Sequence, residues 1–431
     1  MPTLLSPTAR REFLAQLGVG STVAFVASLP VLSFASDTPA PKRGWLTSSD
    51  PSTELTFMSA TKLAQLIRER KVSATEAVQA YIARIEHVNY KLNAVVQRCF
   101  ERALAEAKAA DEALAAGQLK GPLHGVPFTI KDSLDTEGVI STGGTVGREF
   151  FVPPRDATVV ARVRAAGGIL LGKTNTPEFT LAGGGIPGVS TTANIIYGIT
   201  KNPFDQTRST AGSSGGAGSI VSAGGAAFDI GSDYGGSIRM PSHNNGTCGL
   251  KPTFGRVPRT GHIVDYGGIF DSWQEIGPLA RRVEDLNLIT GIIAGPDGKD
   301  VAMVPIPWSD PAAIDVKKLR VGFYAENGVA ENTPETTAVV KQVAALLADY
   351  GWPTKEDFPK DIVMELEEIR SKLSPCSGPS LLRLAEHWNT KAISPTIVAR
   401  AKQELRSTAG VTELLEKQHA NRSRLLGCMK N

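Results

Sequence analysis

Thr210-Ala211-Gly212-Ser213-Ser214-Gly215-Gly216 is the stretch that says most about the chemistry of this sequence. A second cluster of the same kind, Gly235-Gly236-Ser237-Ile238-Arg239, follows after an apolar run. Glycine lets a backbone approach a ligand closely and leaves N–H donors accessible, and serine supplies a hydroxyl nucleophile. The two clusters together therefore predict acyl-transfer chemistry.

The segments around these clusters alternate between strand and helix patterns. Residues 126–130 form a short apolar run typical of a buried strand, and 157–166 predict a helix that leads into a strand at 169–171. Between the clusters, 216–223 predict a helix of small residues and 226–230 a further strand. Strands that alternate with helices predict an α/β fold with a sheet covered by helices.

Helical patterns dominate both ends of the chain beyond residue 55. The region 59–114 is amphipathic, and Ser73-Ala74-Thr75-Glu76 within it has the form of a capping box. After Gly277-Pro278, the pattern predicts a helix at 283–294, a strand at 319–323, a helix at 334–350 and a mostly helical stretch from 361 to 431.

Length and composition fit an ordinary globular protein with a large core. The chain has 431 residues, of which 42% are hydrophobic and 21% charged, enough for one large domain or two smaller ones. The net charge is only +3, and Lys and Arg are scattered among Asp and Glu. Because no basic stripe is present, a nucleic acid is not expected as a partner.

The first 35 residues resemble a twin-arginine export signal. Arg10-Arg11-Glu12-Phe13-Leu14 precedes an apolar stretch, 17–32, and small residues follow at the expected cleavage site, Ser33-Phe34-Ala35. Residues 36–55 then read as a linker. We therefore expect export to the periplasm or beyond, without stable membrane association after cleavage. An uncleaved membrane anchor is the alternative.

Cysteine and histidine spacing gives no sign of a metal site. The four cysteines are far apart and form no CxxC pair, and no HExxH motif is present. A single disulfide is compatible with export. We expect neither a metal nor an organic cofactor.

Two nucleotide-binding patterns match formally. Residues 167–174 satisfy GxxxxGK[ST], but Ile169-Leu170-Leu171 inside the match is better suited to a buried strand than to a phosphate-binding loop. Residues 183–188 satisfy GxGxxG, but Pro187 stands where the helix would begin. Neither match predicts a nucleotide site.

A third pattern, GxSxG at residues 212–216, would make Ser214 the nucleophile of an α/β-hydrolase. That interpretation needs an acidic residue and then a histidine further along the chain. The four histidines that follow stand in no recognisable context: His243, His262, His387 and His419.

Lys131 ends the apolar run of Gly125-Val126-Pro127-Phe128-Thr129-Ile130-Lys131-Asp132. Burial there would destabilise the ammonium and favour a neutral amine, which can act as a base. In combination with the two serine clusters, this lysine points away from the α/β-hydrolase interpretation.

With these motifs the chain resembles the amidase signature family, serine hydrolases with a Ser–cis-Ser–Lys triad. The resemblance runs from Thr56 to Tyr350 and is most specific over Ser209–Thr253, with further matches at Gly125–Asp132, Gly172–Phe179 and Gly277–Arg281. It implies a single large α/β domain over 56–431, in which a central mixed β-sheet is flanked by helices as an α/β/α sandwich. It also implies a strand beyond the helix at 414–426, and since the sequence stops at Asn431 we expect that strand to be missing.

The resemblance assigns roles by motif position. Ser237 corresponds to the nucleophile, Ser213 to a bridging serine in a cis peptide, and Lys131 to the general base. The loop that supplies oxyanion-hole N–H groups corresponds to Tyr234, Gly235, Gly236 and Ser237. Supporting roles fall to Asp233 paired with Arg239, which brace this loop, and to Ser214, which hydrogen-bonds nearby backbone.

The resemblance implies hydrolysis of a small-molecule carboxylic amide, and also of an ester or carbamate, through an acyl-enzyme on Ser237. Three alternatives to this function stay open: a subunit of a glutamine-dependent amidotransferase, a truncated and catalytically impaired member of the family, and a catalytically silent scaffold protein. A homodimer is compatible with all of these.

Overall fold

The computed structural model describes residues 51–181, 191–264, 272–373, 378–403 and 406–430. The predicted signal over 1–35, most of the linker over 36–55 and the GxGxxG match at 183–188 lie outside these residues. The chain divides into two compact units, which are described separately. The first comprises residues up to Ile306 together with Arg383–Ile397, and the second comprises Pro307–Leu382 and Val398 onward.

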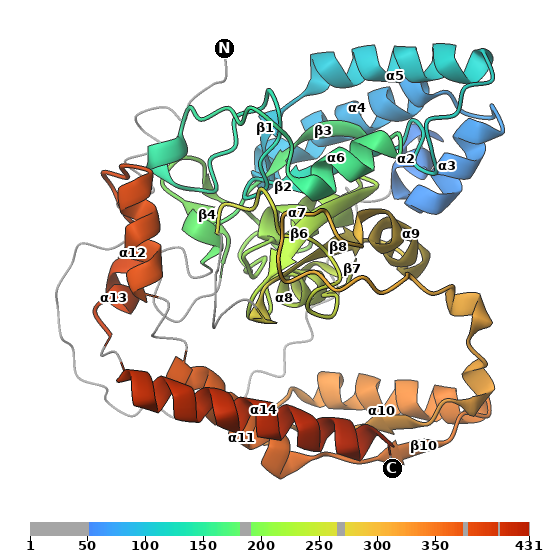
Figure 1. Cartoon of the computed structure of the whole chain (residues 1–431). Helices are drawn as coiled ribbons and strands as arrows, with labels where there is room; N and C mark the ends of the chain where they lie inside the picture. The colour runs from blue at the N-terminus through green and yellow to red at the C-terminus, as the bar shows by residue number, and fades with distance from the viewer. Residues whose placement is uncertain (1–50, 182–190, 265–271, 374–377, 404–405, 431) are drawn as a thin grey trace. The chain divides into compact units, whose positions relative to one another are not determined.

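A six-stranded mixed sheet forms the centre of the first unit (Figure 1). Its strand order is β1-β3-β2-β6-β8-β7, in which β2 runs parallel to both β3 and β6 while the remaining pairs are antiparallel. A two-stranded antiparallel pair, β4 and β5, accompanies it. The strands are β1 (Val95–Arg98), β2 (Pro127–Lys131), β3 (Ile169–Thr174), β4 (Ala193–Asn194), β5 (Gly198–Ile199), β6 (Phe228–Asp233), β7 (Cys248–Gly249) and β8 (Glu275–Ala280).

Helices pack against this sheet, as the sequence predicts for an α/β fold (Figure 1). The capping box is present at the start of α4, where the Ser73 hydroxyl accepts the Glu76 N–H and the Glu76 carboxylate accepts the Ser73 N–H. The α-helices of this unit are α2 (Pro51–Phe57), α3 (Ala60–Arg68), α4 (Ala74–Leu92), α5 (Phe100–Ala115), α6 (Thr158–Ala165), α7 (Gly215–Ser222), α8 (Arg239–Asn245) and α9 (Val283–Ile293).

The central strands are buried along their whole length. Every residue of β2, β3, β6 and β8 is buried, because helices cover the sheet and no face of these strands meets water. Phe128 and Phe228, on neighbouring strands, stack with ring centroids 5.3 Å apart. The parallel strands β2 and β6 therefore bring their carboxyl ends, with Lys131 and Asp233, to one edge of the core.

The second unit is smaller and mostly helical. It holds a parallel pair of strands, β9 (Val321–Phe323) and β10 (Thr354–Glu356), with α10 (Pro334–Asp349), α11 (Lys360–Leu373) and α14 (Thr408–Lys430). Two helices, α12 (Gly378–His387) and α13 (Pro395–Ala401), contain the points where the chain passes between the units. Among the described residues, no helix is long and apolar enough to cross a membrane.

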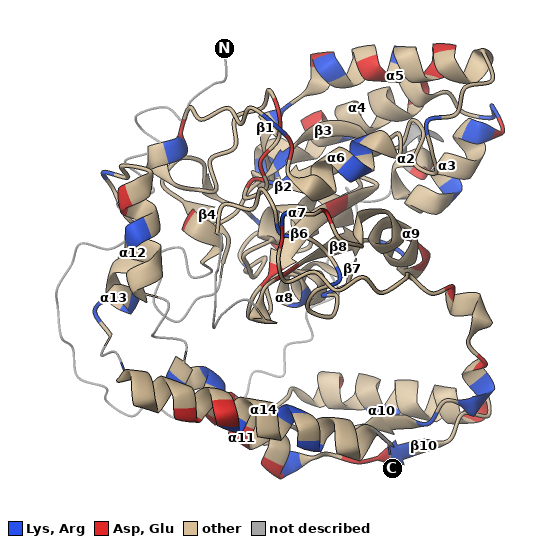
Figure 2. Ribbon diagram, in the orientation of Figure 1, with Lys and Arg blue, Asp and Glu red and all other residues tan. Residues whose placement is uncertain are grey.

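Charged side chains of both signs are interspersed along the helices of each unit (Figure 2). Many of them form short-range pairs within a helix, such as Arg102 with Glu106 on α5 and Lys417 with Glu413 on α14. The described surface thus carries the mixed charge pattern that the sequence analysis expects.

Candidate active site

Lys131 occupies the last position of β2 and is completely buried. Its Nζ lies 2.6 Å from Ser213 Oγ, 3.0 Å from Ser214 Oγ and 3.0 Å from Ser232 Oγ. Serine hydroxyls therefore surround the amine, and no carboxylate is hydrogen-bonded to it among the described residues. The structure brings together the lysine and the bridging serine that the sequence analysis singled out.

The surroundings of Lys131 favour its neutral form. Burial lowers the pKa of the Lys131 amine to about 7, against the opposing charges of Asp233 and Asp229. An amine with a pKa in this range is unprotonated in a large fraction of molecules at neutral pH. Such an amine can accept a proton, so base chemistry at this position would not require a histidine.

Ser213 and Ser214 lie in the loop that leads into α7, and both side chains are buried. The peptide bond between Gly212 and Ser213 is cis, as the resemblance implies. Ser214 Oγ donates to the main-chain oxygen of Ser232 at 3.3 Å. A Cβ atom at Gly231 would lie 2.6 Å from Ser214 Oγ, so only glycine leaves room for this hydroxyl.

Asp233 organises the loop between β6 and α8. Its carboxylate accepts the N–H groups of Gly236 at 2.7 Å and Ile238 at 3.1 Å, together with the Arg239 guanidinium at 3.0 Å. Although burial raises the pKa of Asp233, the hydrogen bonds from Arg239 and the loop outweigh it and hold that pKa below its usual value. The expected pair of Asp233 and Arg239 is therefore present and lies at the base of the loop.

Ser237 is carried by this loop beside the buried serines. Its main-chain oxygen accepts the Ser214 N–H at 3.1 Å, and its side chain is only partly buried. Among the described residues, the hydroxyl of Ser237 and the N–H groups of Gly235 and Ser237 have no hydrogen-bond partner. The Gly236 N–H is taken by Asp233, so Gly235 and Ser237 are the predicted oxyanion donors left unengaged.

The backbone conformation at Gly236 requires a glycine. Its φ is +118°, a conformation that side-chain-bearing residues rarely adopt, and an added Cβ would lie 2.8 Å from Met240 Sδ. Gly235, in contrast, would meet nothing within 4 Å and is exposed. The backbone next to Ser237 is thus accessible to an approaching ligand at Gly235.

Two contributors to the site were not singled out from the sequence. Ser232 Oγ contacts Lys131, and the buried side chain of His262 contacts Ser232 Oγ through Nε2 at 2.9 Å. His262 had no recognisable motif context, because its neighbours at the site come from distant segments. Only the folded chain shows that it lies next to the lysine.

The competing motif interpretations do not fit the structure. Residues 169–174 of the GxxxxGK[ST] match form the buried strand β3, and Lys173 donates to Thr136 Oγ1 and Ser141 Oγ inside the core. Ser214 is completely buried and hydrogen-bonds Lys131, and among the described residues no histidine is hydrogen-bonded to it. A phosphate loop and a nucleophile elbow are both excluded as interpretations of these residues.

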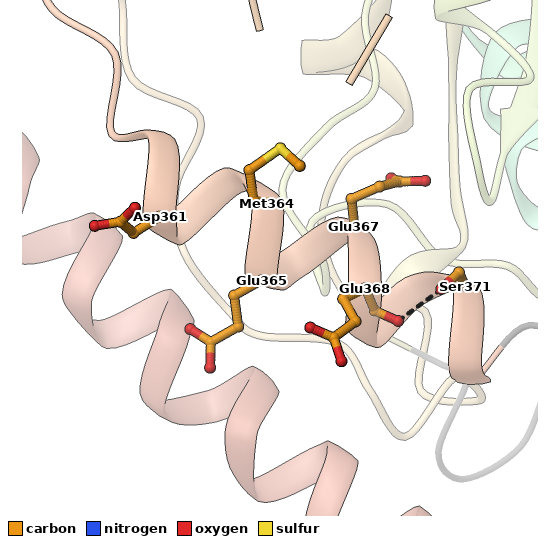
Figure 3. Close-up of a pocket in the computed structure, with 6 residues that line it drawn as sticks. All are labelled: Asp361, Met364, Glu365, Glu367, Glu368 and Ser371. Carbon is orange, nitrogen blue, oxygen red and sulfur yellow. Dashed lines mark hydrogen bonds between the residues drawn. The ribbon is translucent and has the colours of Figure 1, made fainter. Parts of the chain in front are cut away.

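Two hollows of the described surface lie away from these residues. One, of about 530 Å³, runs along α11 and is lined mainly by acidic residues (Figure 3). Glu365 pairs there with Arg424, Glu367 with Arg370, and Glu368 with Lys372. Another, of about 940 Å³, lies beside the edge strand β1. Within the described ranges, no group of three His, Cys, Asp or Glu side chains is placed to hold a metal ion.

Solved structures of amide hydrolases share this fold. Fatty acid amide hydrolase superposes with a TM-score of 0.77 at 25% identity, covering 88% of this chain and 67% of that one. The 6-aminohexanoate cyclic dimer hydrolase, solved with its substrate, gives a TM-score of 0.71 at 30% identity, covering 85% of this chain and 76% of that one.

Curated relatives belong to a glutamyl-tRNA(Gln) amidotransferase. One subunit of this enzyme from Moorella thermoacetica is 41% identical over 301 residues, which is 69% of this chain but 60% of the relative. The corresponding subunit from Carboxydothermus hydrogenoformans is 37% identical over 336 residues, covering 75% of this chain and 67% of the relative. The Amidase family model matches residues 76–423. By this match and by its fold, the chain belongs to the amidase signature family.

Proposed function

We propose that this protein hydrolyses a carboxylic amide, and related esters or carbamates, through an acyl-enzyme on Ser237. The observation that carries the proposal is the buried Lys131 amine, 2.6 Å from Ser213 Oγ and beside the loop that carries Ser237. A buried neutral amine in contact with a serine hydroxyl has one evident chemical use, the removal of a proton from that hydroxyl.

In the proposed reaction, neutral Lys131 takes the proton of Ser213 while Ser213 takes the proton of Ser237. Ser237 Oγ then attacks the substrate carbonyl carbon, and the C–N bond breaks as the amine leaves with a proton returned through Ser213. Water attacks the acyl-enzyme by the same relay, which releases the acid and restores Ser237. Each proton removed by Lys131 is given back, so the enzyme ends as it began.

The Gly235 and Ser237 N–H groups supply the donors for the tetrahedral oxyanion. They are unengaged among the described residues of the resting structure, whereas the Gly236 N–H holds Asp233. One well-aimed donor of this kind is typically worth about 3–4 kcal/mol in the transition state.

A fluorophosphonate probe tests the nucleophile without knowledge of the substrate. It should form a covalent adduct on Ser237 that Ser237→Ala abolishes, whereas Ser214→Ala, which removes a neighbouring hydroxyl, should still be labelled at Ser237. Mass spectrometry of the labelled peptide identifies the residue. An adduct that persists at full yield in Ser237→Ala would overturn the assignment.

The names of the curated relatives favour a second candidate, the glutamine-hydrolysing component of an amidotransferase. On this candidate the preferred amide is glutamine, and activity rises when partner proteins are present. To separate the two candidates, the release of ammonia by the chain alone is measured with glutamine and with simple aliphatic and aryl amides. Preference for the simple amides supports the first candidate, and preference for glutamine supports the second.

We also propose export of the protein, on the basis of Arg10-Arg11 and the apolar stretch that follows. Replacing both arginines by lysine should retain the protein inside the cell, as measured by fractionation. Export at the unchanged level in that variant would contradict a twin-arginine route.

A further inference from the structure

His262 is held beside the end of β2 by backbone pairing between segments far apart in the sequence. The Asp135 N–H donates to the Gly261 oxygen at 2.8 Å, and the Ile263 N–H donates to the Ser133 oxygen at 2.8 Å. These bonds fasten the chain on both sides of His262 to the residues that directly follow the lysine strand. The position of the imidazole is therefore fixed by the main chain as well as by its own contacts.

The groups around the ring favour one of its two neutral tautomers. Nδ1 of His262 lies 3.2 Å from the Val264 N–H and 3.1 Å from the Gln274 side-chain amide, so two donors point toward it. The Val264 oxygen, 3.1 Å from Nδ1, receives a hydrogen bond from the same Gln274 amide. Two donors and one acceptor that is already engaged favour Nδ1 as the acceptor, which places the hydrogen on Nε2, facing Ser232 Oγ at 2.9 Å.

Ser232 transmits this donation to the lysine. Its hydroxyl contacts two groups among the described residues, Nε2 of His262 and Nζ of Lys131 at 3.0 Å. Once the hydroxyl accepts from His262, Lys131 Nζ is the one acceptor left for its own hydrogen within the described part of the chain. A neutral amine offers a lone pair to that hydrogen and an ammonium does not. The arrangement is therefore better satisfied when Lys131 is neutral.

We propose that His262 is a positioning residue that acts through Ser232 to hold Lys131 in its neutral, proton-accepting form. The inference rests on the proposed function, in which Lys131 is the base. His262 touches neither Ser213 nor Ser237 among the described contacts, so its effect is on the readiness of the base and not on the reacting atoms.

The charged groups around the pair act in both directions. Asp229 and Asp233 favour the ammonium form of Lys131. Burial, and then the positive charge of Lys131, lower the pKa of His262 to about 3, and Arg259 and Arg148 act in the same sense. His262 accordingly stays neutral throughout the pH range in which Lys131 titrates, so it contributes a fixed donor.

Two substitutions separate the donor from the remainder of the ring. His262→Gln places an amide N–H near the position of Nε2, whereas His262→Asn keeps polar atoms near Nδ1 but is too short to reach Ser232. The measurement is the rate of Ser237 labelling by a fluorophosphonate as a function of pH. In His262→Asn we expect the acid limb to move up by about 0.5–1 pH unit, and in His262→Gln by less than about 0.3 unit.

A second arm tests the route through Ser232. In a Ser232→Ala background, adding His262→Asn should leave the acid limb unchanged, because the linking hydroxyl is already gone. An equal limb in wild type, Asn and Gln variants, or an Asn shift that persists without Ser232, would overturn the inference. Labelling of wild type at a residue other than Ser237 would instead overturn the proposed function, so the two failures are distinguishable.

Discussion

At the residue scale, the burial of Lys131 sets the pH dependence of the proposed reaction. Its pKa of about 7 means that the base is lost as pH falls through neutrality, because the protonated amine has no lone pair. We expect kcat/KM to decline below about pH 7 and to level off above it. Lys131→Met, which fills similar space without an amine, should lower kcat/KM by about 10²–10⁴-fold at all pH values. A Met variant that kept wild-type activity would contradict the role of the base.

The same residue links stability to pH. The folded-state pKa of Lys131 is lowered from 10.5 to about 7, so between these values the unfolded chain binds a proton that the folded chain does not. The free energy of unfolding therefore gains a contribution that rises with pH across this window. We expect the stability of wild type relative to Lys131→Met to increase from pH 7 to pH 10, as measured by urea unfolding. Parallel pH profiles would mean that the buried amine is charged in the folded protein.

Much of the site could be predicted at this scale, and the reason is local. Lys131, Ser213 and the loop with Asp233 and Arg239 lie in short motifs whose composition already points to chemistry. His262 could not be predicted, since its role depends on pairing between 261–263 and 133–135, which no local pattern reveals.

At the element scale, Asp233 at the end of β6 holds the loop that follows the strand in a fixed conformation. Its oxygens accept two buried main-chain N–H groups, whereas Arg239 is largely exposed, with 57% of its side chain accessible. We expect Asp233→Asn to lower stability by about 1–3 kcal/mol and to reduce labelling of Ser237, because an NH2 group, which cannot accept a hydrogen bond, would replace one of the two oxygens and face a main-chain donor. Arg239→Gln should cost less than about 1 kcal/mol, since exposed pairs contribute little. The reverse order in thermal unfolding would mean that the ion pair holds the loop.

A second carboxylate anchors one helix to another. Asp285 on α9 accepts the N–H groups of Ala60 at 2.9 Å and Thr61 at 2.8 Å, at the start of α3. We expect Asp285→Ala to lower the free energy of unfolding by about 1–3 kcal/mol, because the buried Ala60 N–H and the partly buried Thr61 N–H at the helix start lose their acceptor. Glu284→Ala, which alters an exposed neighbour, serves as the control in urea unfolding. Equal effects would argue that general charge, and not capping, is responsible.

The elements themselves were unequally predictable. The long helices and the strands β2, β3 and β6 follow clear apolar patterns, and the prediction for them is confirmed. The strand β8 was not predicted, because Gly277 and Pro278 within it are residues that usually favour turns. The strand β1 has only four residues between two helices, too few to show a period.

At the scale of the whole molecule, the two compact units differ in how much they bury. Helix α4 of the first unit buries nine of its residues, whereas α10 of the second, described throughout, buries only Ala344. Sparse burial permits local opening at low free energy. We therefore expect the amides of α10 to exchange with deuterium much faster than those of α4, as measured by mass spectrometry. Equal protection of both helices would show that the units unfold as one.

The complete enclosure of Lys131 also has a consequence for the reaction in deuterated water. An amine without solvent contact cannot trade its hydrogen directly with bulk water, so any proton it holds must pass through the surrounding serines. Bulk water therefore reaches the amine only by way of these hydroxyls. We expect a solvent isotope effect, in which acylation of Ser237 is slower in deuterated than in light water because the hydrogens passed along the hydroxyls move in that step.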